Sequence, residues 1–164
     1  MRLGAASPQP PTMSAAPYIA VVGPGEASSQ ELWLAEEVGA GLAELGAVVV
    51  TGGLGGVMEA ACRGARSRQG RTLGILPGDD REAANGWVEI AVATGLGELR
   101  NGLVVRASDA LVAIGGGHGT LSEVGFALKL GRAVIGLGTW AVHGVDEVTT
   151  PEEAVERVAR MLER

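Results

Sequence analysis

The stretch Ile114-Gly-Gly-Gly-His-Gly-Thr-Leu-Ser-Glu123 decides the fold of this chain. An apolar run (110–114) leads into a glycine-rich bend, and the bend leads into a helix-like segment. Backbone N–H groups in such a bend can converge on an anion, and the following helix dipole adds about half a positive charge there. A second glycine run, Thr51-Gly-Gly-Leu-Gly-Gly-Val-Met58, has the same setting. The two runs predict phosphate-binding bends, and together they indicate a nucleotide.

Short apolar runs alternate with longer amphipathic ones from residue 18 onward, which is typical of βα units and a parallel sheet. We expect strands at residues 18–22, 47–50, 72–76, 88–92, 110–114 and 133–137. We expect helices at residues 28–45, 56–67, 96–107, 119–130 and 150–164, the first and last opened by capping boxes at Ser28 and Thr150. The sequence therefore predicts an α/β fold, a Rossmann-like, doubly wound and mainly parallel sheet of six to seven strands flanked by helices.

The chain of 164 residues has the size of one domain. We expect a single nucleotide-binding domain at residues 18–164 after a flexible leader at 1–17, with Met13 as an alternative start. The net charge of −6 argues against a nucleic acid polymer as partner. No apolar run approaches the roughly 20 residues of a membrane-spanning helix. We therefore expect a cytoplasmic protein that does not bind membranes, and its single cysteine, Cys62, suits a reducing compartment.

Glycine bends follow the first, second and fifth expected strands. In a doubly wound sheet, ligands bind beyond the carboxyl ends of the strands, where the winding direction reverses. We therefore expect one pocket for a small nucleotide or nucleotide-like molecule, lined by Gly23, Pro24, Gly25, Gly52, Gly53, Gly55, Gly56, Met58, Gly116, Gly117, His118, Gly119 and Thr120. The alternative is that the bends are tight turns and that His118 is an ordinary loop residue.

Several common site types lack residues that they need. No bend completes G-x-G-x-x-G, because the last position holds Ser28, Met58 or Ser122. Lys129 is the only lysine, and it lies well along a helix, so a P-loop and a pyridoxal phosphate-dependent lysine decarboxylase are both excluded. The two histidines form no ligand cluster. We expect neither a metal nor a resident cofactor.

The stretch Gly116-Gly-His-Gly-Thr-Leu-Ser-Glu123 resembles the P-G-G-x-G-T-x-x-E signature of the Lonely Guy family. These proteins are cytokinin-activating nucleoside 5′-monophosphate phosphoribohydrolases, often mislabelled as lysine decarboxylases. Arg100 precedes Glu123 by the interval that separates the essential arginine of that family from its essential glutamate. The resemblance covers residues 18–162 and is greater to an uncharacterised bacterial branch that is also similar to molybdenum cofactor carrier proteins. It implies a Rossmann-like fold and a homodimer or higher homo-oligomer.

The chain departs from this signature at several positions. Gly115 stands in place of the proline, and Glu59 stands where the family usually has glycine. The M-H-x-R-K pattern around the arginine is replaced by Gly97-Glu-Leu-Arg-Asn101, so a histidine and a lysine are missing. These departures leave the backbone donors of the bends in place and remove two side chains of the enzyme pattern.

Glu123 and Arg100 are the candidate catalytic residues. A carboxylate stabilises the oxocarbenium-like transition state of N-glycosidic cleavage. Thr120 lies on the same helix face and can hold phosphate while Glu123 reaches the ribose, and Arg100 can orient Glu123 or contact phosphate. The alternative is that Thr120-Leu-Ser-Glu123 is a capping box, in which Glu123 only satisfies the helix start, and that Arg100 is a solvated charge.

Two functions follow from these residues. The first is a hydrolase that cleaves a nucleoside 5′-monophosphate into free base and ribose 5-phosphate, which the retained Arg100 and Glu123 favour. The second is a non-catalytic carrier or sensor of a nucleotide-like ligand such as the molybdenum cofactor, which the missing histidine and lysine favour. The first is slightly preferred on the sequence.

Overall fold

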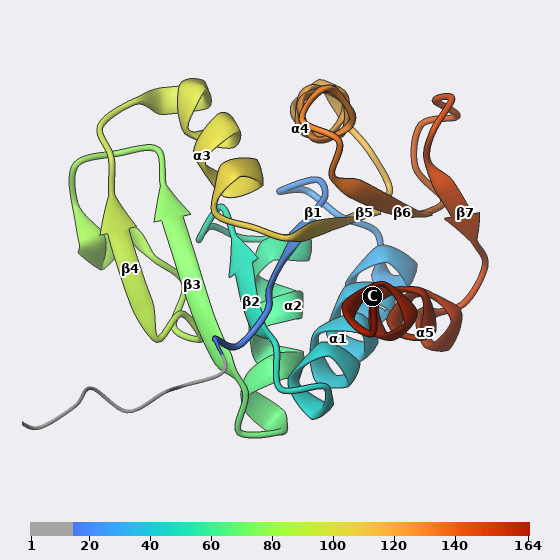
Figure 1. The fold of residues 1–164 in the computed structure, drawn as a ribbon. Coiled ribbons are helices and arrows are strands. Elements are labelled where there is room, and N and C mark those ends of the chain that lie inside the picture. Colours follow the sequence, from blue (N-terminus) through green and yellow to red (C-terminus); the bar gives the residue numbers. More distant parts are fainter. Residues whose placement is uncertain (1–14) are drawn as a thin grey trace, which may run out of the picture.

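The computed structural model describes residues 15–164, so only residues 15–17 of the expected leader fall within it, and the alternative start at Met13 lies outside. These residues form a seven-stranded sheet in the order β4-β3-β2-β1-β5-β6-β7, and every neighbouring pair is parallel (Figure 1). The strands are β1 Tyr18–Val22, β2 Val48–Thr51, β3 Arg71–Leu76, β4 Ile90–Ala93, β5 Ala110–Ile114, β6 Ala133–Leu137 and β7 Asp146–Val148. The predicted α/β, Rossmann-like class is confirmed.

The helices form two layers, one on each face of the sheet. The layer of α1, α2 and α5 covers one face, and α3 and α4 lie over the other (Figure 1). Capping boxes open α1 at Ser28 and α5 at Thr150, as predicted. The helices and the short 3₁₀ turns are α1 Ser29–Glu44, α2 Val57–Ser67, η1 Arg81–Ala83, η2 Gly97–Arg100, α3 Asn101–Arg106, α4 His118–Lys129 and α5 Pro151–Leu162.

The central strands are buried on both faces. Ile19 and Val21 of β1 belong to the apolar cluster beneath α1, α2 and α5, whereas Ala20 and Val22 belong to the cluster beneath α3 and α4. Successive side chains of a strand point to opposite faces, so a strand covered on both sides needs apolar residues at every position. This explains why these strands could be recognised as continuous apolar runs.

Four expected elements need correction. The helix expected at 96–107 is observed as two consecutive helical elements, the 3₁₀ turn η2 and the short helix α3, which together span residues 97–106. The strand expected at 88–92 is β4 Ile90–Ala93, because the Val88 N–H is used in a turn onto the Asn85 carbonyl. The strand expected at 47–50 is shifted by one residue, and the last helix ends at Leu162. Strand β7 was not located from the sequence, because it is short and starts with two acidic residues.

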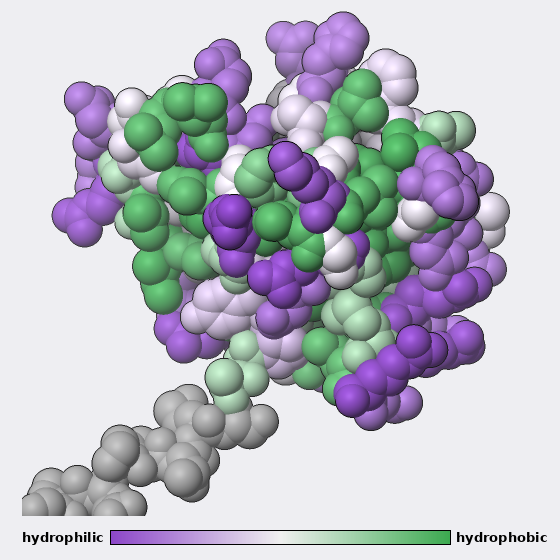
Figure 2. All heavy atoms as spheres, turned by 45° about the horizontal axis from the view of Figure 1, so that its top comes forward, coloured by the Kyte–Doolittle hydropathy of each residue, from purple (hydrophilic) through white to green (hydrophobic). Residues whose placement is uncertain are grey.

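One flank of the sheet carries exposed apolar side chains. Ile90 and Val92 of β4 are 45% and 44% exposed, and they pair in register with Leu73 and Ile75 of β3. Leu99 of η2 is 78% exposed. Figure 2 shows hydrophobic side chains gathered over this side of the molecule, where β3, β4 and α3 lie. We call the exposed set of Ile90, Val92, Leu96, Leu99 and Leu103 the apolar flank. Separately, none of the helices in the described part of the chain is long and apolar enough to cross a membrane.

Candidate functional site

The winding direction of the sheet reverses between the neighbouring strands β1 and β5. After β1 the chain passes to α1 on one face, and after β5 it passes to α4 on the other (Figure 1). A crevice is expected at such a point beyond the carboxyl ends of the strands. The structure has a cavity of about 470 Å³ there. This volume lies within the range of roughly 300–1,000 Å³ that small-molecule sites occupy.

The cavity brings together most of the residues expected from the sequence. Ten of them line it: Gly23, Pro24, Gly25, Gly52, Met58, Arg100, Gly117, Gly119, Thr120 and Glu123. Five expected residues do not line it: Gly53, Gly55, Gly56, Gly116 and His118. Seven lining residues were not selected from the sequence: Val21, Val22, Leu54, Pro77, Gly97, Glu98 and Asn101. Val22 and Pro77 lie at or directly after the end of a strand, and Leu54 and Asn101 adjoin selected residues, whereas Val21, Gly97 and Glu98 do neither.

Several expected residues outside the cavity shape its walls. Gly56 adopts a φ of +64°, and a Cβ on it would overlap the carbonyl oxygen of Pro24, so only glycine fits between the two bends. The Gly53 carbonyl accepts hydrogen bonds from the backbone and the side chain of Asn85, at 2.9 and 3.3 Å. Asn85 Nδ2 also donates to the Leu54 carbonyl at 2.9 Å. The polar loop after β3 therefore fixes the second glycine run.

The third glycine bend is held from the side by Trp140. Its indole Nε1 donates to the Gly117 carbonyl at 3.1 Å, and its ring stacks on the His118 imidazole with 6.0 Å between the centroids. A Cβ on Gly116 would lie 2.7 Å from that same indole nitrogen. Gly116 and His118 therefore contact the tryptophan rather than the cavity, while Gly117 and Gly119 remain open to the cavity.

The helices that follow the second and third glycine bends begin without side-chain caps. Gly117 is the N-cap of α4 and Gly56 is the N-cap of α2, and neither position supplies a capping hydrogen bond. In contrast, Ser28 and Thr150 cap α1 and α5 fully. The first N–H groups of a helix have no partner within the helix. At α4 these groups lie where Gly117, Gly119 and Thr120 line the cavity, so they are available to an anion.

Arg100 is held in the wall of the cavity. Its Nη1 donates to the Asn101 Oδ1, and its Nη2 donates to the Gly52 carbonyl at 3.4 Å. Asn101 Nδ2 in turn reaches Ser122 Oγ of α4 at 3.4 Å. The arginine side chain is 8% exposed, and its Nε has no hydrogen-bond partner within the described residues. Arg100 is therefore a buried cation that links the second glycine run to the α3 and α4 layer, and not a solvated surface charge.

Glu123 projects from α4 into the same cavity. It is 7% exposed, and its carboxylate accepts no hydrogen bond from residues 15–164. Burial raises the pKa of Glu123 to about 7, and the positive charge of Arg100 offsets only part of that effect. Because α4 begins at His118 without a side-chain cap, Glu123 does not satisfy the helix start. The capping-box alternative for this residue is wrong.

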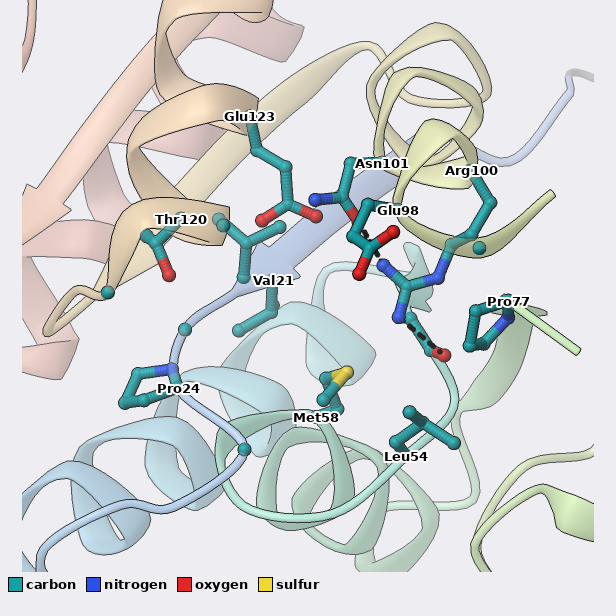
Figure 3. Close-up of a pocket in the computed structure, with 17 residues that line it drawn as sticks. Val21, Pro24, Leu54, Met58, Pro77, Glu98, Arg100, Asn101, Thr120 and Glu123 are labelled. Carbon is teal, nitrogen blue, oxygen red and sulfur yellow. Dashed lines mark hydrogen bonds between the residues drawn. The ribbon is translucent and has the colours of Figure 1, made fainter.

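Figure 3 shows how the side chains divide the cavity. Thr120 and Glu123 project from α4 on one side, and the Glu98 carboxylate turns toward the same space from η2. Met58 and Leu54 lie across the cavity from them and form an apolar floor. The cavity thus combines backbone donors, carboxylate acceptors and an apolar surface, a composition that is typical of small-molecule sites.

The comparisons with known proteins agree with this geometry. The model of the SLOG cluster4 family matches residues 16–163. The chain belongs to that family. An uncharacterized protein of Archaeoglobus fulgidus is 44% identical over 138 residues, covering 84% of this chain and 91% of the relative. The resemblance inferred from the glycine signature is thereby confirmed at the level of the family.

Two solved structures of molybdenum cofactor proteins are similar to this SLOG cluster4 protein along nearly their whole length. One is the molybdenum cofactor binding protein of the phototrophic bacterium Rippkaea orientalis, with 37% identity and a TM-score of 0.87 over 92% of this chain and 99% of the other. The second is the molybdenum cofactor carrier protein of Chlamydomonas reinhardtii, with 34% identity and a TM-score of 0.83 over 92% and 100%. These structures share the fold described above.

The described residues hold no group of three or more histidine, cysteine, aspartate or glutamate side chains that could bind a metal ion. Cys62 is buried, and its Sγ lies 3.5 Å from the Thr51 hydroxyl. Burial raises the pKa of the Cys62 thiol, so it is held as a structural thiol rather than as a reactive thiolate.

Proposed function

We propose that this protein binds one small phosphorylated heterocycle of the nucleotide type and carries it without cleaving it, the molybdenum cofactor being the candidate cargo. The observation that carries the proposal is the construction of the cavity, with the uncapped amino end of α4 on one side and an apolar floor on the other. A phosphate fits the first and a planar ring fits the second.

The residues around the cavity suit a carrier better than an enzyme. Glu98 and Asn101 occupy the positions where the Lonely Guy signature has a histidine and a lysine. Asn101 Oδ1 accepts from Arg100, so the arginine is held by its neighbours and by the Gly52 carbonyl. The similarity to the two molybdenum cofactor proteins described above supports the same choice.

The chain fits the phosphate and the ring of this cargo and offers no thiolate to its metal. Gly117, Gly119 and Thr120 would hold the phosphate through their backbone N–H groups, and Met58 and Leu54 would contact the ring. The single cysteine of the chain does not line the cavity. The molybdenum would therefore be coordinated by atoms of the cofactor itself and not by a cysteine of the protein.

The experiment is mass spectrometry of the small molecules that co-purify with the native protein, followed by calorimetric titration of the emptied protein with GMP, AMP and ribose 5-phosphate. We expect a phosphorylated pterin or nucleotide in the extract and binding of at least one phosphorylated probe. The Gly117→Ala variant serves as control, because its added methyl group enters the phosphate end of the cavity. Absence of binding to every phosphorylated probe would contradict the proposal.

A phosphoribohydrolase is the second candidate, and Glu123 favours it. A carboxyl group with a pKa of about 7 can exist in both protonation states near neutral pH, which suits a general acid that protonates a departing base. Incubation of the purified protein with a panel of purine monophosphates tests this directly. Release of free base that Glu123→Gln abolishes would establish the enzyme and rule out the carrier. If no monophosphate releases free base although binding is measurable, the phosphoribohydrolase is excluded.

We also propose that the protein associates with a second copy of itself through the apolar flank. Leu99 is the most exposed apolar side chain of the flank, and it adjoins Arg100 at the cavity. Light scattering coupled to gel filtration should show a dimer or a higher oligomer, and Leu99→Glu should shift it toward the monomer. A monomeric wild-type protein at high concentration would contradict this.

A further inference from the structure

We propose that Glu98 selects the heterocycle that the cavity accepts, by accepting hydrogen bonds from the paired N–H groups of a 2-amino-4-oxopyrimidine ring. Guanine and pterin share this edge, and adenine lacks it. The inference rests on the proposed function, because it identifies which ring the phosphorylated ligand carries. Glu98 stands at one of the positions where the chain departs from the Lonely Guy signature.

The charges of the cavity fix the orientation of the ligand. Unused backbone donors lie at the amino end of α4, around Gly117 and Thr120. The Glu98 carboxylate lies on η2, which reaches the cavity from the opposite side. A phosphate is attracted to the first place and repelled from the second. The heterocycle therefore lies toward Glu98, over the apolar floor of Met58 and Leu54.

A second carboxylate in the cavity, that of Glu123, is also free to accept hydrogen bonds from N–H or O–H groups of a ligand. Glu123 is more than nine-tenths buried, faces the cavity and accepts no hydrogen bond from residues 15–164. It lies on the same side as Thr120, so it meets the sugar portion between phosphate and ring. Glu98 lies on η2, on the other side of the cavity from Thr120, where it would meet the ring edge.

The hydrogen-bonding groups on the edge of the ring that faces Glu98 decide which heterocycle fits. An ionised carboxylate only accepts hydrogen bonds, and its two oxygens suit two parallel N–H donors. The N1–H of guanine, or the N3–H of pterin, supplies this pair together with the adjacent 2-amino group. Adenine places its N1 acceptor at the same point, and two acceptors repel each other. Arg100 lines the same cavity and supplies its buried positive charge.

The substitution Glu98→Gln should shift the preference of the cavity from guanine toward adenine. It keeps the size of the side chain and exchanges one acceptor for an NH₂ donor. A side-chain amide offers one donor and one acceptor, which complements the N1 and 6-amino groups of adenine. The same change penalises guanine, because the new NH₂ group faces a ring donor.

The test is calorimetric titration of the full-length protein with GMP, AMP, neopterin phosphate and ribose 5-phosphate. We expect the wild type to bind GMP about tenfold more tightly than AMP, and we expect Glu98→Gln to reduce that ratio by at least about tenfold. The ratio cancels the effect of removing one negative charge, since both nucleotides carry the same phosphate. Glu147→Gln, which removes an exposed carboxylate of β7, is the matched control and should leave the ratio unchanged.

The outcomes separate the inference from the proposed function. Equal affinities for GMP and AMP, or a ratio that Glu98→Gln does not change, overturn the inference while ribose 5-phosphate binding still supports the cavity as a phosphate site. Failure to bind any of the four probes overturns both. Tighter binding of neopterin phosphate than of GMP indicates that the ligand carries a pterin ring, and the reverse indicates that it carries guanine. A thermal melt of each variant confirms that it is folded.

Discussion

Replacing Glu123 by glutamine should change the way in which the stability of the protein depends on pH. The pKa of an ordinary glutamate is 4.5, and burial raises the pKa of Glu123 to about 7. Between these values the unfolded chain has released the proton and the folded protein has kept it, so the free energy of unfolding falls as the pH rises. The raised pKa thus favours the folded state fully below pH 4.5, and that contribution is lost as the pH rises to about 7. A pKa difference of this size corresponds to about 3 kcal/mol.

Urea unfolding of the wild type and of Glu123→Gln at pH 4.5, 6 and 8 measures this effect. We expect the variant to gain about 3 kcal/mol relative to the wild type between the lowest and the highest pH. Taking the difference between the two proteins cancels the titration of all other groups that the substitution leaves alone. Glu147→Gln, at an exposed position, controls for the general loss of one carboxylate. A Glu123→Gln difference that stays constant across the three pH values would refute the reasoning.

Three further substitutions test the walls of the cavity. Gly117→Ala should weaken ribose 5-phosphate binding about tenfold without loss of stability, because its Cβ meets no atom within 4 Å and enters the cavity; Gly125→Ala, equally open but on the exposed side of α4, should leave binding unchanged. Trp140→Phe keeps a ring and loses the hydrogen bond to the Gly117 carbonyl, so titration should show a roughly fivefold weaker complex. Gly52→Ala places a Cβ 2.6 Å from Arg100 Nη2. Since the end of a flexible side chain can move, urea unfolding should show a loss of about 1 kcal/mol, and a crystal structure should show the arginine displaced.

Features that depend on local sequence could be predicted. The capping boxes at Ser28 and Thr150 need residues only three positions apart, and the buried strands β1, β5 and β6 were located within their observed bounds. The glycine bends could be placed at one edge of the sheet, because parallel strands end together. The short strand β7 could not be located, since its pairing with β6 compensates for a polar sequence that does not indicate a strand.

Features that depend on the meeting of distant segments could not be predicted fully. Asn101 connects Arg100 to Ser122, a contact across 21 residues that no local pattern announces. Whether Glu123 caps a helix or faces a ligand depends on where α4 begins, and a start at His118 places the carboxylate too far along for the capping role. Trp140 reaches Gly117 from another loop. The family motif identified the positions of Glu98 and Asn101, but only the fold shows that they line the cavity.

The proposed phosphorylated ligand is an anion, although the cavity contains more carboxylates than cations. Arg100 supplies one buried positive charge, while Glu98 and Glu123 are both present. Two features compensate for this excess. The amino end of α4 contributes fixed N–H dipoles without a mobile counter-charge, and the raised pKa of Glu123 lets that side chain accept a proton near neutral pH. An anion bound in this way depends on backbone geometry and on one proton, and not on a cluster of arginine or lysine side chains. Loss of the proton from Glu123 would weaken such binding, which suits the carrier role proposed above.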